Sequence, residues 1–233
     1  MHAPSPERET DLLNEMQRFL QAAVHDLRSV QRRTGTTAEL LVQADDDGER
    51  AALAMQLLQG VLKTDELLAG IGRYATALPP AGYAMQAFAA GGAVRFAVAH
   101  LDREIRETGA TITVRELPDV TGDRDRIAEV FEHLIGNALK FRGPDPPVVE
   151  ISARRAPEGW VFSVRDNGVG IPGKYRDRLF TPFRRLHGAE VPGAGLGLAI
   201  CRKVLDAHRG RIWVEDGDGM GVTFSFVLPE TGP

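Results

Sequence analysis

The sequence predicts an α+β protein in which a hairpin of two long helices precedes a layered sheet domain. Residues 7–44 contain no proline and only one glycine, and they are rich in residues that favour helices. Beyond residue 84 the pattern changes to alternating strand-like and helical segments. The 233 residues are enough for a helical module joined to one domain of ordinary size.

The first predicted helix carries a narrow apolar stripe. Along it, apolar residues recur at alternating spacings of four and three, at Met16, Leu20, Ala23, Leu27 and Val30. This spacing is typical of the seam of a coiled coil or helix bundle rather than of a strand. We therefore expect this helix to pack against other helices.

A second helix follows a turn at residues 45–48, where three aspartates precede a glycine. Its apolar residues run from Leu53 to Ile71, and the helix is expected to end near Leu78. Because two helices alone bury little apolar surface, we expect two chains to combine their hairpins into a dimeric four-helix bundle. Residues 7–78 are therefore predicted to be the dimerisation hairpin.

A linker is predicted at residues 79–84, where two prolines and a glycine interrupt the helical pattern. The second domain is expected to span residues 85–230. Its predicted strands are residues 111–115, 148–153, 160–165, 211–214 and 222–228. Its predicted helices are residues 92–108, 123–141 and 195–208. These elements predict an α+β layer sandwich.

Composition and charge narrow the function classes. Hydrophobic residues make up 43 % of the chain and charged residues 26 %, which fits a folded protein rather than a disordered one. The net charge of −4 gives no general attraction to nucleic acid. No apolar run approaches the roughly 18 residues of a membrane span. The single cysteine, Cys201, excludes an internal disulfide and suits the cytoplasm, where we expect the protein to reside.

A carboxylate and two glycines follow the predicted strand 160–165. Asp166 stands at the strand end, and Gly168 and Gly170 let the backbone turn sharply so that a ligand could approach. Taken alone, this run is equally typical of an ordinary glycine turn.

A second glycine-rich segment, made of Gly193, Gly195, Leu196 and Gly197, opens the predicted helix 195–208. Backbone N–H groups and the positive end of a helix suit a chain of phosphates. The segment lacks the Lys-Ser/Thr ending of a P-loop, and it follows a loop rather than a strand. A P-loop and a dinucleotide-binding fingerprint are therefore both disfavoured.

The predicted helix 123–141 has an unusually polar side. His133, Asn137 and Lys140 lie along it at helical spacing. A carboxamide oxygen is a ligand that Mg²⁺ accepts, and an ammonium group suits phosphate oxygens. Each residue alone would be an ordinary solvated side chain, but the ordered set of helix, acidic turn and glycine segment predicts a nucleotide site.

These elements resemble the N, G1 and G2 boxes of the ATP-binding domain of sensor histidine kinases, and Phe180 and Phe183 resemble the F box. The amino-acid sequence around Phe141 and Phe183 is most similar to that of phytochrome-type and related kinases. The resemblance implies a Bergerat-type α/β sandwich that binds ATP. It also implies that residues 172–192 form a mobile lid over the nucleotide.

The resemblance assigns roles to the polar residues of this domain. Asp166 would bind the adenine amino group, Asn137 would hold Mg²⁺ against the phosphates, and Lys140 would face phosphate. The pocket would be shaped by the two glycine segments, at Gly168, Gly170, Gly193, Gly195, Leu196 and Gly197.

A histidine on the first helix completes the resemblance. His25 lies two positions before Leu27, on the outward face of the stripe. The run from Val24 to Ser29 resembles the H box, whose histidine is phosphorylated from ATP. Asp26 would orient the ring or accept its proton, and Ser29 occupies a position that helps relatives to dephosphorylate their partner. That partner would be an aspartate of a response-regulator receiver domain.

Three departures from the family pattern leave alternatives open. Val30 stands where a proline is usual, and His133 replaces an asparagine. No sensory domain is recognisable, so we expect either a fragment or a kinase that a separate sensory protein controls. One alternative is therefore a dimeric pseudokinase that acts as a docking scaffold. A gyrase- or MutL-type ATPase is disfavoured because such enzymes carry glutamate at the place of His133, and Glu132 is one position out of register.

Overall fold

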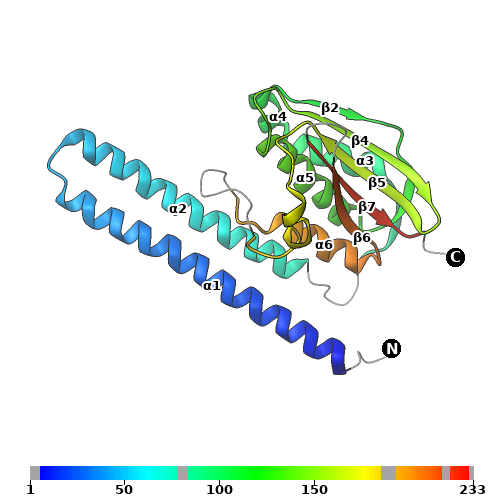
Figure 1. The fold of residues 1–233 in the computed structure, drawn as a ribbon, viewed down its shortest axis with the longest axis horizontal. Helices are drawn as coiled ribbons and strands as arrows, with labels where there is room; N and C mark the ends of the chain where they lie inside the picture. The colour runs from blue at the N-terminus through cyan, green and yellow to red at the C-terminus, as the bar shows by residue number, and fades with distance from the viewer. Residues whose placement is uncertain (1–5, 78–82, 185–192, 217–220, 231–233) are drawn as a thin grey trace. The chain divides into compact units, whose positions relative to one another are not determined.

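The computed structural model describes residues 6–77, 83–184, 193–216 and 221–230 (Figure 1). The chain divides into two compact units. One unit contains the chain up to Arg73 together with the segment that ends at Leu196, and the other contains the rest from Tyr74 onward. Residues 79–82 of the predicted linker and 185–192 of the predicted lid lie outside the described residues.

The first unit is the predicted helical hairpin. Helix α1 spans Pro6–Gln43 and α2 spans Asp47–Thr76, and the two run side by side from a short turn (Figure 1). The turn is closed by a capping bond, because Asp46 Oδ2 accepts the backbone N–H of Glu49 at 2.8 Å. The prediction of two long helices is confirmed.

The apolar stripe of α1 is buried only in part. Ala23 and Val30 are buried, as predicted for a seam, and they are joined by Phe19. In contrast, Met16 and Leu20 are 41 % and 54 % exposed. A single neighbouring helix covers one side of the stripe, so the other side remains open in one chain. The predicted dimer would cover that side.

The second unit contains a five-stranded sheet in the order β2-β4-β5-β7-β6. Only the β2–β4 pair is parallel, and the other neighbours are antiparallel. In chain order the strands are β2 Thr111–Val114, β4 Val148–Ala156, β5 Gly159–Asp166, β6 Arg211–Asp216 and β7 Val222–Leu228. All five correspond to predicted strands, and β7 has the predicted bounds.

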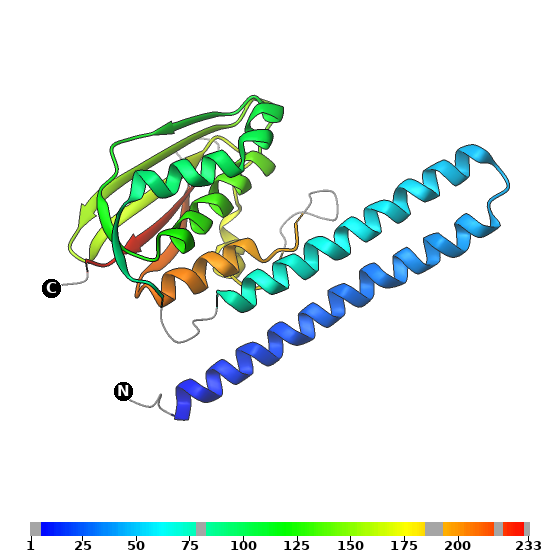
Figure 2. The same cartoon turned by 180° about the vertical axis from the view of Figure 1, so that it is seen from behind.

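Three helices cover one face of this sheet: α3 (Ala90–His100), α5 (Arg124–Lys140) and α6 (Gly197–Ala207) (Figures 1 and 2). The core between the two layers is aromatic. Phe131 of α5 meets Phe162 of β5 edge-on, with ring centroids 5.8 Å apart. It meets a third phenylalanine, on β7, in the same way at 5.4 Å. This packing fixes α5 on the sheet.

The structure corrects the sequence prediction at three places. The helix expected near 92–108 is two helices, because the backbone leaves helical geometry at Leu101 before α4 (Asp102–Thr108) begins. A two-stranded sheet of β1 (Gln86–Ala89) and β3 (Asp119–Gly122) was not predicted. Its strands of four residues are too short to show a period. A short 3₁₀ helix, η1, was also missed at Gly173–Arg178.

Among the described residues, we find no helix that combines the length and the apolar character needed to cross a bilayer.

Candidate functional site

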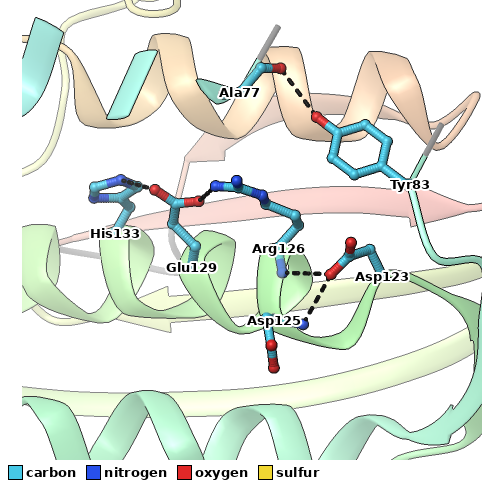
Figure 3. Close-up of polar contacts among 7 residues, drawn as sticks. All are labelled: Ala77, Tyr83, Asp123, Asp125, Arg126, Glu129 and His133. Carbon is cyan, nitrogen blue, oxygen red and sulfur yellow. Dashed lines mark hydrogen bonds and ion pairs between the residues drawn. The ribbon is translucent and has the colours of Figure 1, made fainter. Parts of the chain in front are cut away.

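Helix α5 presents the predicted polar residues because its opposite side is apolar and buried on the sheet. Ile127, Leu134 and Ala138 belong to that buried side. Asn137 is half-buried and Lys140 is exposed near the end of the helix. Asp123 caps the start, since its Oδ1 accepts the backbone N–H groups of Asp125 and Arg126, both at 3.2 Å (Figure 3).

Charged and polar side chains follow one another along α5 from Arg126 to His133 (Figure 3). Arg126 Nη1 donates to Glu129 Oε2 at 3.0 Å, and Glu129 Oε1 lies 3.9 Å from His133 Nε2. The other side of the His133 ring faces the first residue of α6: a β-carbon at Gly197 would lie 3.1 Å from His133 Nδ1. His133, the residue that departs from the pattern of the resemblance, therefore lies between α5 and the start of α6.

The acidic turn lies at the end of β5. Asp166 Oδ1 accepts the backbone N–H groups of Gly168 at 2.8 Å and Val222 at 3.3 Å. Burial raises the pKa of the Asp166 carboxyl, and these two N–H groups offset part of that rise. The carboxylate is therefore held in one orientation by the backbone.

The same turn is tied to the end of α5. The backbone N–H of Val169 donates to the Phe141 carbonyl at 3.0 Å. A β-carbon at Gly168 would lie 2.5 Å from that carbonyl oxygen, so only glycine fits. These contacts bring the Asp166 turn next to the helix end that carries Asn137 and Lys140. The structure thus gathers these three predicted residues in one region of the second unit.

Sequence reasoning missed a further glycine of this turn. Gly221 has φ of +100°, and a β-carbon there would lie 2.0 Å from the Asp166 carbonyl oxygen. It precedes β7 directly, in a run of alternating glycines after β6, which is the signal that could have revealed it.

We expect Gly221→Ala to lower the free energy of unfolding by about 2 kcal/mol or more, because backbone strain and overlap with a rigid carbonyl add. Chemical denaturation measures this. Gly143→Ala is the matched control, because a β-carbon at Gly143 would meet nothing within 4 Å and its φ is not positive. Equal stability of the two variants would contradict this view of the turn.

The two predicted phenylalanines lie after η1, and the second predicted glycine segment is divided between the two units. Phe180 and Phe183 follow η1 and are half-buried, and Phe183 has φ of +60°, which is unusual outside glycine. Gly193, Gly195 and Leu196 group with the first unit, whereas Gly197 starts α6 in the second.

His25 lies on α1 with its side chain 76 % exposed. Its Nδ1 is 3.0 Å from Asp26 Oδ1. Ser29 is half-buried one turn later. The ring borders a shallow hollow on α1 whose lining residues are Leu20, Gln21, Val24, His25, Arg28, Gln31 and Arg32. The imidazole is therefore open to a partner and oriented by a carboxylate.

Comparison with known proteins places the chain in a family. A family model described as histidine kinase-, DNA gyrase B- and HSP90-like ATPase matches residues 122–232. A solved catalytic domain of the histidine kinase ThkA is 30 % identical with a TM-score of 0.55, and the match covers 64 % of this chain and 99 % of that one. The chain belongs to the histidine kinase family. The resemblance found in the sequence is thereby confirmed.

Two further matches extend the comparison to the hairpin. Cyanobacterial phytochrome A of Nostoc sp. strain PCC 7120 is 37 % identical over 222 residues, which are 94 % of this chain and 29 % of the phytochrome. ThkA in complex with the response regulator TrrA has a TM-score of 0.76 at 23 % identity, covering 97 % of this chain and 64 % of that chain. This confirms the fold of a hairpin followed by a sheet domain. The chain spans less than a third of the length of the curated relatives that it matches first.

Proposed function

We propose that this histidine kinase chain autophosphorylates His25 from ATP and passes the phosphoryl group to an aspartate of a receiver domain. The observation that carries the proposal is the pair of His25 and Asp26, an exposed imidazole oriented by a carboxylate on the hairpin of a kinase-family chain. Exposure is required because the ring must reach a nucleotide held by another domain.

The geometry of this pair supports different roles for the two ring nitrogens. An ionised carboxylate only accepts, so Nδ1 carries the proton that faces Asp26, and Nε2 keeps its lone pair. Attack by Nε2 on the γ-phosphorus forms an N–P bond and breaks the bond to the bridging oxygen, and ADP leaves. The Nδ1 proton passes to Asp26, which leaves the phosphorylated ring neutral.

The second unit would hold the nucleotide. Asp166 would accept the adenine amino group, Asn137 would hold Mg²⁺, and Lys140 would face the phosphates. The donor chemistry fits, because a carboxamide oxygen is a hard ligand. Within the described ranges no group of three or more His, Cys, Asp or Glu side chains is placed to hold a metal ion. When bound there, Mg²⁺ would neutralise charge on the phosphates.

The hollow on α1 is the proposed docking surface for the receiver domain. Arg28 and Arg32 line it beside His25, and their positive charge suits a partner that presents an acceptor aspartate. We further propose a homodimer, in which a second copy covers exposed apolar side chains of the hairpin. These include Met16, Met55, Leu58 and Leu62, with Leu20 at the edge that this surface shares with the hollow.

We expect Arg28→Glu to slow phosphoryl transfer to the receiver by about tenfold, because a like charge then faces the acceptor carboxylate. Autophosphorylation should change by no more than about twofold, since the described hairpin shows the ring of His25 paired with Asp26 and not with Arg28. Arg33→Glu makes the same charge change on α1 outside the hollow and serves as the control. Equal slowing by both variants would show a general charge effect and contradict the docking surface.

A pseudokinase scaffold remains the second candidate, and His133 is the observation that favours it. The ring lies against Gly197 at the start of α6, at a position where the resemblance implies an asparagine. A gyrase-like ATPase is disfavoured by geometry as well as by register. Glu132 Oε2 lies 3.2 Å from His100 Nδ1, so this carboxylate is engaged with α3.

The test is incubation with γ-labelled ATP, with and without Mg²⁺. The kinase predicts label that depends on Mg²⁺ and is acid-labile but base-stable, as expected for a phosphohistidine. Nucleotide binding without label would support the scaffold, and labelled free phosphate without labelled protein would support an ATPase.

A further inference from the structure

A buried histidine joins the ends of two helices in the second unit. His208 follows α6 and is only 4 % exposed. Its Nδ1 lies 2.7 Å from the Val204 carbonyl oxygen, and its Nε2 accepts the backbone N–H of Asp123 at 2.9 Å. A carbonyl oxygen only accepts, so the two partners assign the neutral tautomer with the proton on Nδ1. Both ring nitrogens are therefore used.

The partner of Nε2 is the residue that starts α5. Asp123 caps this helix through its side chain while its own N–H is held by His208. The ring also fits closely against the preceding residue, since a β-carbon at Gly122 would lie 3.0 Å from His208 Cδ2. One imidazole thus fixes the start of α5 relative to the end of α6. These helices carry Asn137 and Gly197 of the proposed nucleotide site.

A tyrosine connects His208 to the end of α2. The ring of Tyr83 packs on the His208 ring with centroids 5.3 Å apart. Its hydroxyl donates to the Ala77 carbonyl at 3.0 Å, just after α2 ends (Figure 3). Ala77 is fully buried, and the chain from Tyr74 onward belongs to the second unit. Burial raises the pKa of Tyr83, which keeps the hydroxyl protonated as a donor.

We propose that His208 is a positioning residue of the nucleotide site, and that Tyr83 links it to the end of α2. A displacement of the last turn of α2 would move the tyrosine ring, and with it the histidine that sets the spacing of α5 and α6. The inference rests on the proposed function, because nucleotide binding is what makes these two helices a site.

Coupling of this kind is reciprocal. If the position of the last turn of α2 affects nucleotide affinity, nucleotide binding must affect that turn by the same free energy. A merely structural role of the two rings would lower stability, but it would not make the last turn of α2 respond to nucleotide. This difference provides the test.

The experiment is amide hydrogen exchange on the whole chain, with and without the ATP analogue AMPPNP and Mg²⁺, with binding followed by calorimetry on the same samples. Tyr83→Phe keeps the ring stack and removes only the hydroxyl bond to Ala77. His208→Phe keeps an aromatic ring and removes both ring hydrogen bonds. His100→Gln is the control, because His100 is a half-exposed histidine on α3.

In the wild type, AMPPNP should slow exchange in the last turn of α2 by at least about fivefold. Tyr83→Phe should bind the analogue with similar affinity and protect α5 and α6, yet lose this effect on α2. His208→Phe should lose the effect and bind less tightly, and His100→Gln should behave as the wild type. A bound analogue that leaves the last turn unchanged in the wild type, or a full effect in Tyr83→Phe, would overturn the link.

The ligand-free samples separate failure of the link from failure of the proposed function. Without nucleotide, His208→Phe should speed exchange of the Asp123 amide relative to His100→Gln, because the acceptor at His208 Nε2 is removed. If the analogue does not bind to the wild type, the proposed function fails. Faster Asp123 exchange in His208→Phe would then still support His208 as the residue that positions the start of α5, whereas unchanged exchange would overturn it.

Discussion

His25→Gln is expected to abolish incorporation of label from γ-labelled ATP while nucleotide affinity changes by no more than about twofold. Glutamine has no ring nitrogen with a lone pair for attack on phosphorus, although it retains polarity and exposure. The measurement is acid-labile, base-stable label on the protein, with calorimetric titration of AMPPNP on the same preparation.

His100→Gln is a closely matched control for this substitution. Both histidines are exposed on helices, and both place Nδ1 near a carboxylate, at 3.0 Å for Asp26 and 3.2 Å for Glu132. The control should label as the wild type does. Label that survives His25→Gln, or that disappears equally in both variants, would end the assignment of His25 as phosphoacceptor.

Asp166→Asn is expected to weaken binding of adenine nucleotides by about 10- to 100-fold. Its amide oxygen can still accept the backbone N–H groups of Gly168 and Val222, as the carboxylate does now. The amino group must then face the nucleotide, where the adenine amino group is also a donor. Calorimetric titration with AMPPNP and Mg²⁺ measures the loss.

The same substitution offers a control on the nucleotide. Inosine triphosphate carries a carbonyl oxygen in place of the adenine amino group, so its acceptor would meet the amino group of the asparagine. The variant should therefore lose much less affinity for the inosine nucleotide than for the adenine nucleotide. Equal losses would mean that Asp166 acts through folding of the turn and not through the base.

The elements with strong local signals were predictable from the sequence. The aspartates before Gly48 and the long proline-free run set the hairpin, and alternating apolar residues set β7 with its observed bounds. The short strands β1 and β3 escaped because their pairing is decided by tertiary contact rather than by local pattern. The break between α3 and α4 at Leu101 was likewise not predicted, because no glycine or proline marks it in the sequence.

The proposed site divides in the same way. Asp166 and Asn137 stand in motifs, so a single sequence reveals them. Gly221 lies against the Asp166 carbonyl, 55 positions away in the sequence. His208 accepts the Asp123 amide N–H, 85 positions away. Such contacts exist only once the sheet and its helices have assembled. His133 was noticed as a departure, but only the structure shows that its ring packs against Gly197.

The most direct measurement is localisation of the phosphoryl group by mass spectrometry under neutral conditions, after incubation of the chain with ATP and Mg²⁺. An exposed histidine on α1 whose Nδ1 lies 3.0 Å from Asp26 Oδ1 predicts one modified side chain, the imidazole of His25. A phosphoryl group on any other residue, or an unmodified chain that nevertheless binds nucleotide, would contradict the account.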